Sequence, residues 1–191
     1  MFRKMNSGSN SSMYRIAIIL SFILFAAIVR IFPHPWNFTP LGAVALFSGA
    51  KLSRSWKAFL FPLAALFCGD VFIGFHRLMP VVYLSFCVSV LIGMAFRKRQ
   101  SLKPLAAATF LGALQFFLIT NFGVWAMSNF YPHSPAGLVT CYVAGIPYLG
   151  NTLASDCFYM VLLFGGFALI QRLSPALAGS QSSSPRLDHV E

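Results

Sequence analysis

The stretch LAAATFLGALQFFLITNFGVWAMSNF, residues 105–130, decides the fold, because it carries no charged side chain over its whole length. A helix needs roughly 20 mainly apolar residues to cross a bilayer, and this stretch exceeds that length. Five more apolar segments accompany it. The six predicted spans cover residues 14–32, 38–52, 56–75, 78–96, 105–130 and 151–173. The second is short and fits a partly re-entrant helix. The sequence therefore predicts an all-α, polytopic membrane protein, with a bundle of six transmembrane helices over residues 14–173.

The composition of the 191 residues excludes a water-soluble globule. Hydrophobic residues make up 58% and charged residues 9%, against roughly 25% charged in a soluble domain. The net charge of +10 could indicate a nucleic-acid partner. The basic residues instead flank the apolar segments, which favours a lipid bilayer and no nucleic acid. The four cysteines lack metal-ligand spacing, so we expect neither a metal nor a cofactor.

The distribution of positive charge predicts the orientation. Of the 14 Lys and Arg, all but Arg30 and Arg77 fall on flanks of the spans that share one side. Lys and Arg accumulate on the cytoplasmic side of membrane proteins. We therefore expect residues 1–13 to be a polar cytoplasmic N-terminus and residues 174–191 to be a disordered cytoplasmic tail.

Polar side chains gather in the outer halves of the predicted spans. Asp70 and Asp156 each lie about 7 to 8 Å below an outer span end, at 1.5 Å per residue. An intramembrane acid costs roughly 2.5 to 3.5 kcal/mol at a span's centre, so such residues usually face a bundle interior. Residues 131–150 contain turn-forming Pro and Gly and predict an external loop that could close as a lid. The predicted residues of a solute pocket are Asn37, Asp70, Tyr83, Asn121, Trp125, Asn129, Asn151, Asp156 and Tyr159.

Two alternatives stand beside the pocket. In a structural protein without a solute, one of Asp70 and Asp156 would pair with Arg30 and the other would bond helix-end amides. In an intramembrane enzyme, the two acids would share a proton as an aspartyl dyad. The sequence before Asp70 reads Phe-Cys-Gly rather than Gly-x-Gly, and Ser155 rather than Tyr precedes Asp156. Both half-motifs of an intramembrane aspartyl protease are thus broken, and we expect no enzyme.

Four motifs carry a resemblance to a known family. They are FPHPWNFTPLGAVALFSGA at residues 32–50, CGD at 68–70, SNFYPH at 128–133 and IPYLGNTL at 146–153. With these motifs, residues 14–172 resemble a family of small bacterial membrane proteins described as candidate transport proteins. That family is similar to the substrate-binding S-components of energy-coupling-factor vitamin transporters, and to solitary cobalamin transporters.

The resemblance implies a six-helix S-component-like fold in the bacterial cytoplasmic (inner) membrane, with both termini inside. It also implies a vitamin-like solute bound near the outer face. An energy-coupling transmembrane subunit with ATPases would be the partner, because the chain has no phosphate-binding loop of its own. S-components dock that subunit through Ala-x-x-x-Ala, which Ala17 and Ser21 approximate. Cobalamin as the solute would need an axial ligand such as Cys68, Cys87 or His76. The identity of the solute stays open.

Overall fold

A computed structural model of the chain describes residues 37–52, 56–99 and 101–173, together with positions 21, 24–26, 28 and 29. Within these ranges the chain is helical and contains no strand. The predicted N-terminus 1–13, the predicted tail 174–191 and most of the predicted span 14–32 lie outside the described residues. So do Ala17 and Arg30, and with them the docking motif and the proposed ion pair.

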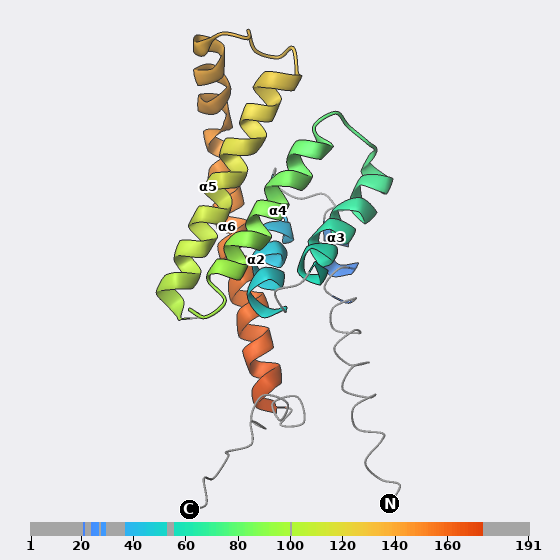
Figure 1. The fold of residues 1–191 in the computed structure, drawn as a ribbon, viewed down its shortest axis with the longest axis vertical. Coiled ribbons are helices and arrows are strands. Elements are labelled where there is room, and N and C mark those ends of the chain that lie inside the picture. Colours follow the sequence, from blue (N-terminus) through green and yellow to red (C-terminus); the bar gives the residue numbers. More distant parts are fainter. Residues whose placement is uncertain are drawn as a thin grey trace, which may run out of the picture.

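Five helices have defined bounds (Figure 1): α2 Leu41–Lys51, α3 Lys57–Ile73, α4 Met79–Ala95, α5 Leu102–Met127 and α6 Pro135–Leu173. The first four confirm that the predicted segments 38–52, 56–75, 78–96 and 105–130 are helical. Within the described ranges, two stretches are long and apolar enough to cross a membrane, α5 and Pro135–Leu169 of α6. The short helix α2 covers only about 17 Å at 1.5 Å per residue.

Helix α2 forms the centre of the described core. All its residues are buried except Gly42, Phe47 and Lys51, and it packs against α3, α4, α5 and α6. Its closest neighbour is α4, because glycines on both helices remove the intervening side chains. A Cβ atom at Gly49 would overlap the Val90 carbonyl oxygen, and one at Gly93 would overlap the Leu46 carbonyl oxygen. Small residues of this kind let helix backbones approach closely.

An amide side chain joins α5 to α4. The Nε2 atom of Gln115 donates to the Ser85 carbonyl oxygen at 3.1 Å and to the Ser89 hydroxyl at 2.7 Å. The rings of Phe86 and Phe116 pack beside it with centroids 5.3 Å apart. Hydrogen bonds between helices hold apolar bundles together where lipid offers no polar partner.

The expected loop over residues 131–150 is wrong, because α6 begins at Pro135. The hydroxyl of Ser134 accepts the Gly137 N–H at 3.2 Å and caps the helix, and proline is favoured in the first helical turn. Gly145 lies against the side chains of Asn121 and Phe117 on α5. This glycine therefore serves helix packing rather than a turn. The lid expected from these residues is instead a helix packed on α5.

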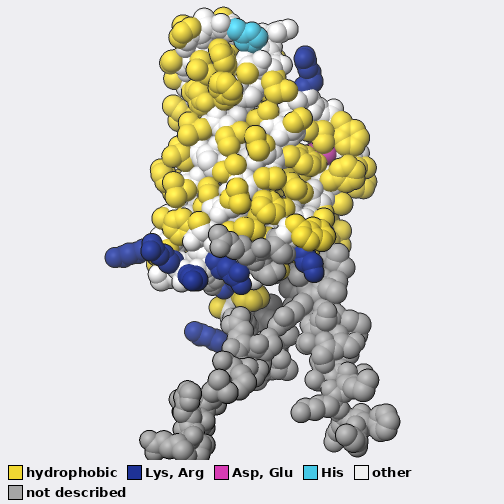
Figure 2. All heavy atoms as spheres, viewed as in Figure 1, with side chains coloured by type: hydrophobic (Ala, Val, Ile, Leu, Met, Phe, Trp, Pro, Cys, Tyr) yellow, Lys and Arg dark blue, Asp and Glu magenta, His cyan; other side chains and the backbone are white. Residues whose placement is uncertain are grey.

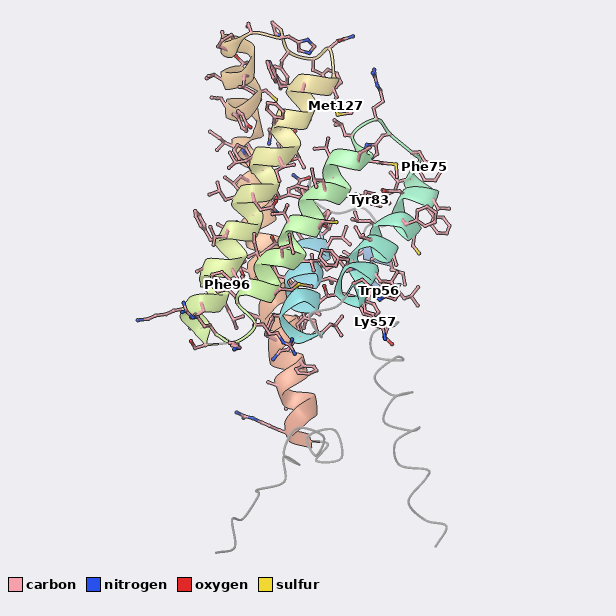
Figure 3. The ribbon with its side chains drawn as sticks, viewed as in Figure 1. Trp56, Lys57, Phe75, Tyr83, Phe96 and Met127 are labelled. Carbon is pink, nitrogen blue, oxygen red and sulfur yellow. The ribbon has the colours of Figure 1, made fainter. Side chains whose placement is uncertain are left out.

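Figure 2 shows apolar side chains over the flank of the molecule and Lys and Arg gathered at one end. We call this the basic end. The helix ends that meet there (Figure 1) carry Lys51, Lys57, Arg97, Lys98, Arg99, Lys103 and Arg172. Figure 3 places Lys57 and Phe96 at this end, and Phe75 and Met127 at the opposite end. Of the described Lys and Arg, Arg77 alone lies away from the basic end, in the α3–α4 connection.

Candidate functional site

The start of α2 is fastened to the middle of α6, and we call this junction the α2 entrance. The Ser155 hydroxyl donates to the Thr39 carbonyl oxygen at 2.8 Å. The ring of Phe38 packs on Phe158 and on Tyr159, with centroids 6.3 and 6.0 Å apart. Three side chains of one helix therefore hold the residues that lead into α2.

The carboxyl group of Asp156 completes this junction. It is 3% exposed, and it accepts a hydrogen bond from the backbone N–H of Ala43. A Cβ atom at Gly42 would overlap the same carboxyl group, so only glycine leaves it room. Asp156 thus lies directly on the first turn of α2.

Helix α2 needs this contact because its own sequence provides no cap. The residue before the helix is Pro40, no side-chain cap bond is present, and the first turn contains no acid. The first amide groups of a helix have no partner within it and carry partial positive charge. The carboxyl oxygen of Asp156 supplies the missing acceptor from another helix.

A second buried acid lies between α3 and α4. Asp70 is 0% exposed, and the Tyr83 hydroxyl donates to its Oδ2 atom at 3.0 Å. Figure 3 shows Tyr83 on the side of α4 that faces α3. At 1.5 Å per residue, Asp70 lies about 20 Å along α3 from Lys57.

A third polar group joins α5 to the first half of α6. The Oδ1 atom of Asn121 lies against Gly145, while its Nδ2 atom donates to the Phe117 carbonyl oxygen at 2.8 Å. The indole of Trp125 donates to the Pro132 carbonyl oxygen at 3.0 Å, and its ring meets His133 edge-on at 5.7 Å. This group lies near the place where α5 ends and α6 begins, at the end of the molecule remote from the basic end (Figure 1).

Comparison with known proteins identifies the family. The model of a family described as a family of unknown function, DUF6580, matches residues 10–177. The chain belongs to the DUF6580 family. No curated protein and no solved structure matches the chain significantly. The family's description states no activity, and the resemblance to S-components therefore remains a proposal.

In this DUF6580 chain the nine predicted residues fall into separate groups. The α2 entrance brings together Asp156 and Tyr159, next to the exposed Asn37, whose φ of 59° turns the chain into the helix. Asp70 and Tyr83 form the second group and Asn121 and Trp125 the third. Asn129 is exposed in the α5–α6 connection, and Asn151 is half-buried on α6.

The helix start predicted shortly before Asp156 is wrong. We expected the acid near the outer start of its helix, but α6 begins at Pro135, about 30 Å before Asp156. The acid is therefore near the middle of a long helix. Gly42, which was not predicted as a site residue, makes room for this carboxyl group because it has no side chain. Only the contact between the two helices reveals that role.

The side chains of these groups can form hydrogen bonds and aromatic contacts. Asp70 and Asp156 have different partners, Tyr83 and the Ala43 amide. Within residues 37–52, 56–99 and 101–173, no three His, Cys, Asp or Glu side chains come together as a metal site would require.

The bond between Tyr83 and Asp70 gives a direct test of that second group. Tyr83→Phe should lower the free energy of unfolding by about 2 kcal/mol, since a buried carboxyl group loses a donor. The matched control is Tyr142→Phe, which removes a 2.9 Å bond to the Leu118 carbonyl oxygen at an exposed position. The control should cost about 1 kcal/mol or less. Equal thermal unfolding midpoints for the two variants in detergent would contradict this ranking.

Proposed function

We propose that this chain is a multi-pass protein of the bacterial inner membrane that binds a small, vitamin-like solute for transport. It would act as an S-component-like subunit or as a solitary transporter. The apolar flank and the basic end support the membrane location (Figure 2). By the positive-inside rule the basic end faces the cytoplasm, and the two termini would lie on that side of a six-span bundle.

One observation carries the proposal: α2 is a half-length helix that begins inside the bundle. Its 11 residues reach about 17 Å, against roughly 30 Å for a bilayer core. Residues 37–40 precede it in non-helical conformation. Non-helical backbone at membrane depth is tolerated only when protein buries it or when it lines a water-filled cavity. Broken helices of this kind form the central binding sites of many transporters.

The side chains around the α2 entrance suit a polar or amphiphilic solute. Asn37 offers an amide, Asp156 a carboxyl group and Tyr159 an aromatic face. The solute would contact these three residues, because the groups of Asp70 with Tyr83 and of Asn121 with Trp125 are separate from the α2 entrance. Sites of this class combine many apolar contacts with a few placed polar groups.

A structural protein without a solute is the second candidate, and one observation favours it. Asp156 already has a partner inside the protein, the Ala43 amide. In that case the acid would exist to cap α2, and no small molecule would need it. The two candidates differ in what an added solute does to the purified protein.

The experiment is a thermal-shift panel on the full-length protein in detergent. Thiamine, riboflavin, biotin and cobalamin serve as probes, together with any small molecule that mass spectrometry identifies in the purified sample. A bound solute stabilises the folded state by mass action. We expect at least one compound to raise the unfolding midpoint, and Asp156→Asn to weaken its apparent affinity about tenfold or more.

Thr140→Val is the matched control, because the Thr140 hydroxyl bonds back to Ala136 of its own helix on an exposed face. This variant should keep the full shift. A solute-induced shift that survives Asp156→Asn would contradict the proposed site. A panel in which no compound and no co-purified molecule changes the midpoint would favour the structural protein.

A further inference from the structure

The basic end combines positive charge with exposed apolar side chains. Arg97, Lys98 and Arg99 lie in the α4–α5 connection, and Lys103 follows in the first turn of α5. Leu102, between the last two, is 81% exposed, and Trp56 beside Lys57 is 69% exposed. Cations placed next to exposed aliphatic and indole groups match the boundary between lipid headgroups and acyl chains.

The acids of the described chain lie elsewhere. Asp70 and Asp156 are the only acidic residues within the described ranges, and both are buried. Asp70 is near the far end of α3, and Asp156 is near the middle of α6. The described surface of the basic end therefore presents one sign of charge.

We propose that the α4–α5 connection binds the headgroups of anionic phospholipids in the cytoplasmic leaflet. Charge complementarity selects this partner, since the connection is cationic, exposed and followed directly by the exposed side chain of Leu102. Juxtamembrane Lys and Arg attract anionic lipids, with roughly a fivefold gain in local partitioning for each charge. This inference goes beyond the proposed transport function and does not depend on any solute.

The positive-inside rule gives a simpler account of the same charges, in which they orient the chain during insertion and bind nothing afterwards. The two accounts differ in the folded protein. Headgroup binding requires that anionic lipid stabilise the purified protein more than zwitterionic lipid does. Orientation alone requires no such preference.

The test uses the full-length protein in detergent, titrated with phosphatidylglycerol or with phosphatidylcholine of the same acyl chains. Retained lipids are counted by native mass spectrometry, and the unfolding midpoint is measured in parallel. We expect phosphatidylglycerol to raise the midpoint at least twice as much as phosphatidylcholine does. Raising NaCl to about 0.5 M should remove most of that difference, because salt screens exposed charges.

The variant Lys98→Gln/Arg99→Gln/Lys103→Gln should lose at least half of the phosphatidylglycerol effect. The charge-preserving variant Lys98→Arg/Arg99→Lys/Lys103→Arg should keep it. Single substitutions provide a matched pair: Arg99→Gln should weaken the effect, and Arg77→Gln in the α3–α4 connection should not. If the triple variant does not fold, the comparison of Arg99→Gln with Arg77→Gln and the salt dependence still test the proposal.

Three results would overturn the proposal. The first is equal stabilisation by the two lipids. The second is an undiminished phosphatidylglycerol effect in the triple variant or in Arg99→Gln. The third is an equal shift with inorganic phosphate at the same concentration, which would indicate general anion binding rather than a lipid surface.

Discussion

Gly93→Ala should lower the free energy of unfolding by about 2 to 3 kcal/mol, the upper range for overpacking a core. The added methyl group would overlap the Leu46 carbonyl oxygen, which belongs to the backbone of α2 and cannot rotate away. Helix α4 would have to move off the central helix. Alanine otherwise favours a helix by about 1 kcal/mol over glycine, so the sign of the effect is informative. Thermal or denaturant unfolding in detergent measures it.

Gly165→Ala on α6 is the matched control, because a Cβ atom there meets nothing within 4 Å. This variant should be neutral or more stable than the parent protein. Gly49→Ala should be harmful like Gly93→Ala, since its Cβ would overlap the Val90 carbonyl oxygen. The double variant should cost less than the two single costs added, because both open the same crossing. A Gly93→Ala protein as stable as Gly165→Ala would disprove the close contact.

The second large effect is expected at Asp156. Asp156→Leu should cost about 3 kcal/mol, because the Ala43 amide stays buried without its acceptor and the first turn of α2 loses its cap. Asp156→Asn keeps a side-chain oxygen in the same position and should cost about 1 kcal/mol or less. The difference between the two variants isolates the hydrogen bond from the shape of the side chain.

Cys157→Leu controls for the larger side chain, because Cys157 is the next residue and is exposed. It should leave the unfolding midpoint nearly unchanged. Equal stability of the Leu and Asn variants at position 156 would show that the α2 entrance does not need the acceptor. Because no solute is added, this outcome tests the cap apart from the proposed binding function.

The helices were predictable wherever an apolar segment was bounded by charge or by turn residues. The predicted segment 56–75 corresponds to the helix Lys57–Ile73, and the predicted segment 78–96 corresponds to the helix Met79–Ala95. The sequence predicts a loop in place of the first half of α6, because Pro and Gly favour turns. Pro135 instead starts the helix, and Gly145 makes room for a neighbour. Proline and glycine can each belong to a turn or to a helix, and the local sequence does not distinguish the two cases.

The candidate site was partly predictable for the same reason. Buried acids stand out in an apolar chain, so Asp70 and Asp156 were identified without a structure. Their partners were not, because Tyr83 and Ala43 lie on other helices. The role of Gly42 also depends on a residue far along the chain.

The sequence by itself determined the apolar helices, the one-sided placement of positive charge and the small number of acids within apolar segments. These properties follow from local composition, because each segment carries its own apolar and charged side chains whatever the other segments are. Only the tertiary structure decided that α2 is a short central helix, that Gly93 lets α4 lie against it, and that Asp156 caps it. Those features arise where distant segments meet, and the energy of such a contact depends on both surfaces at once.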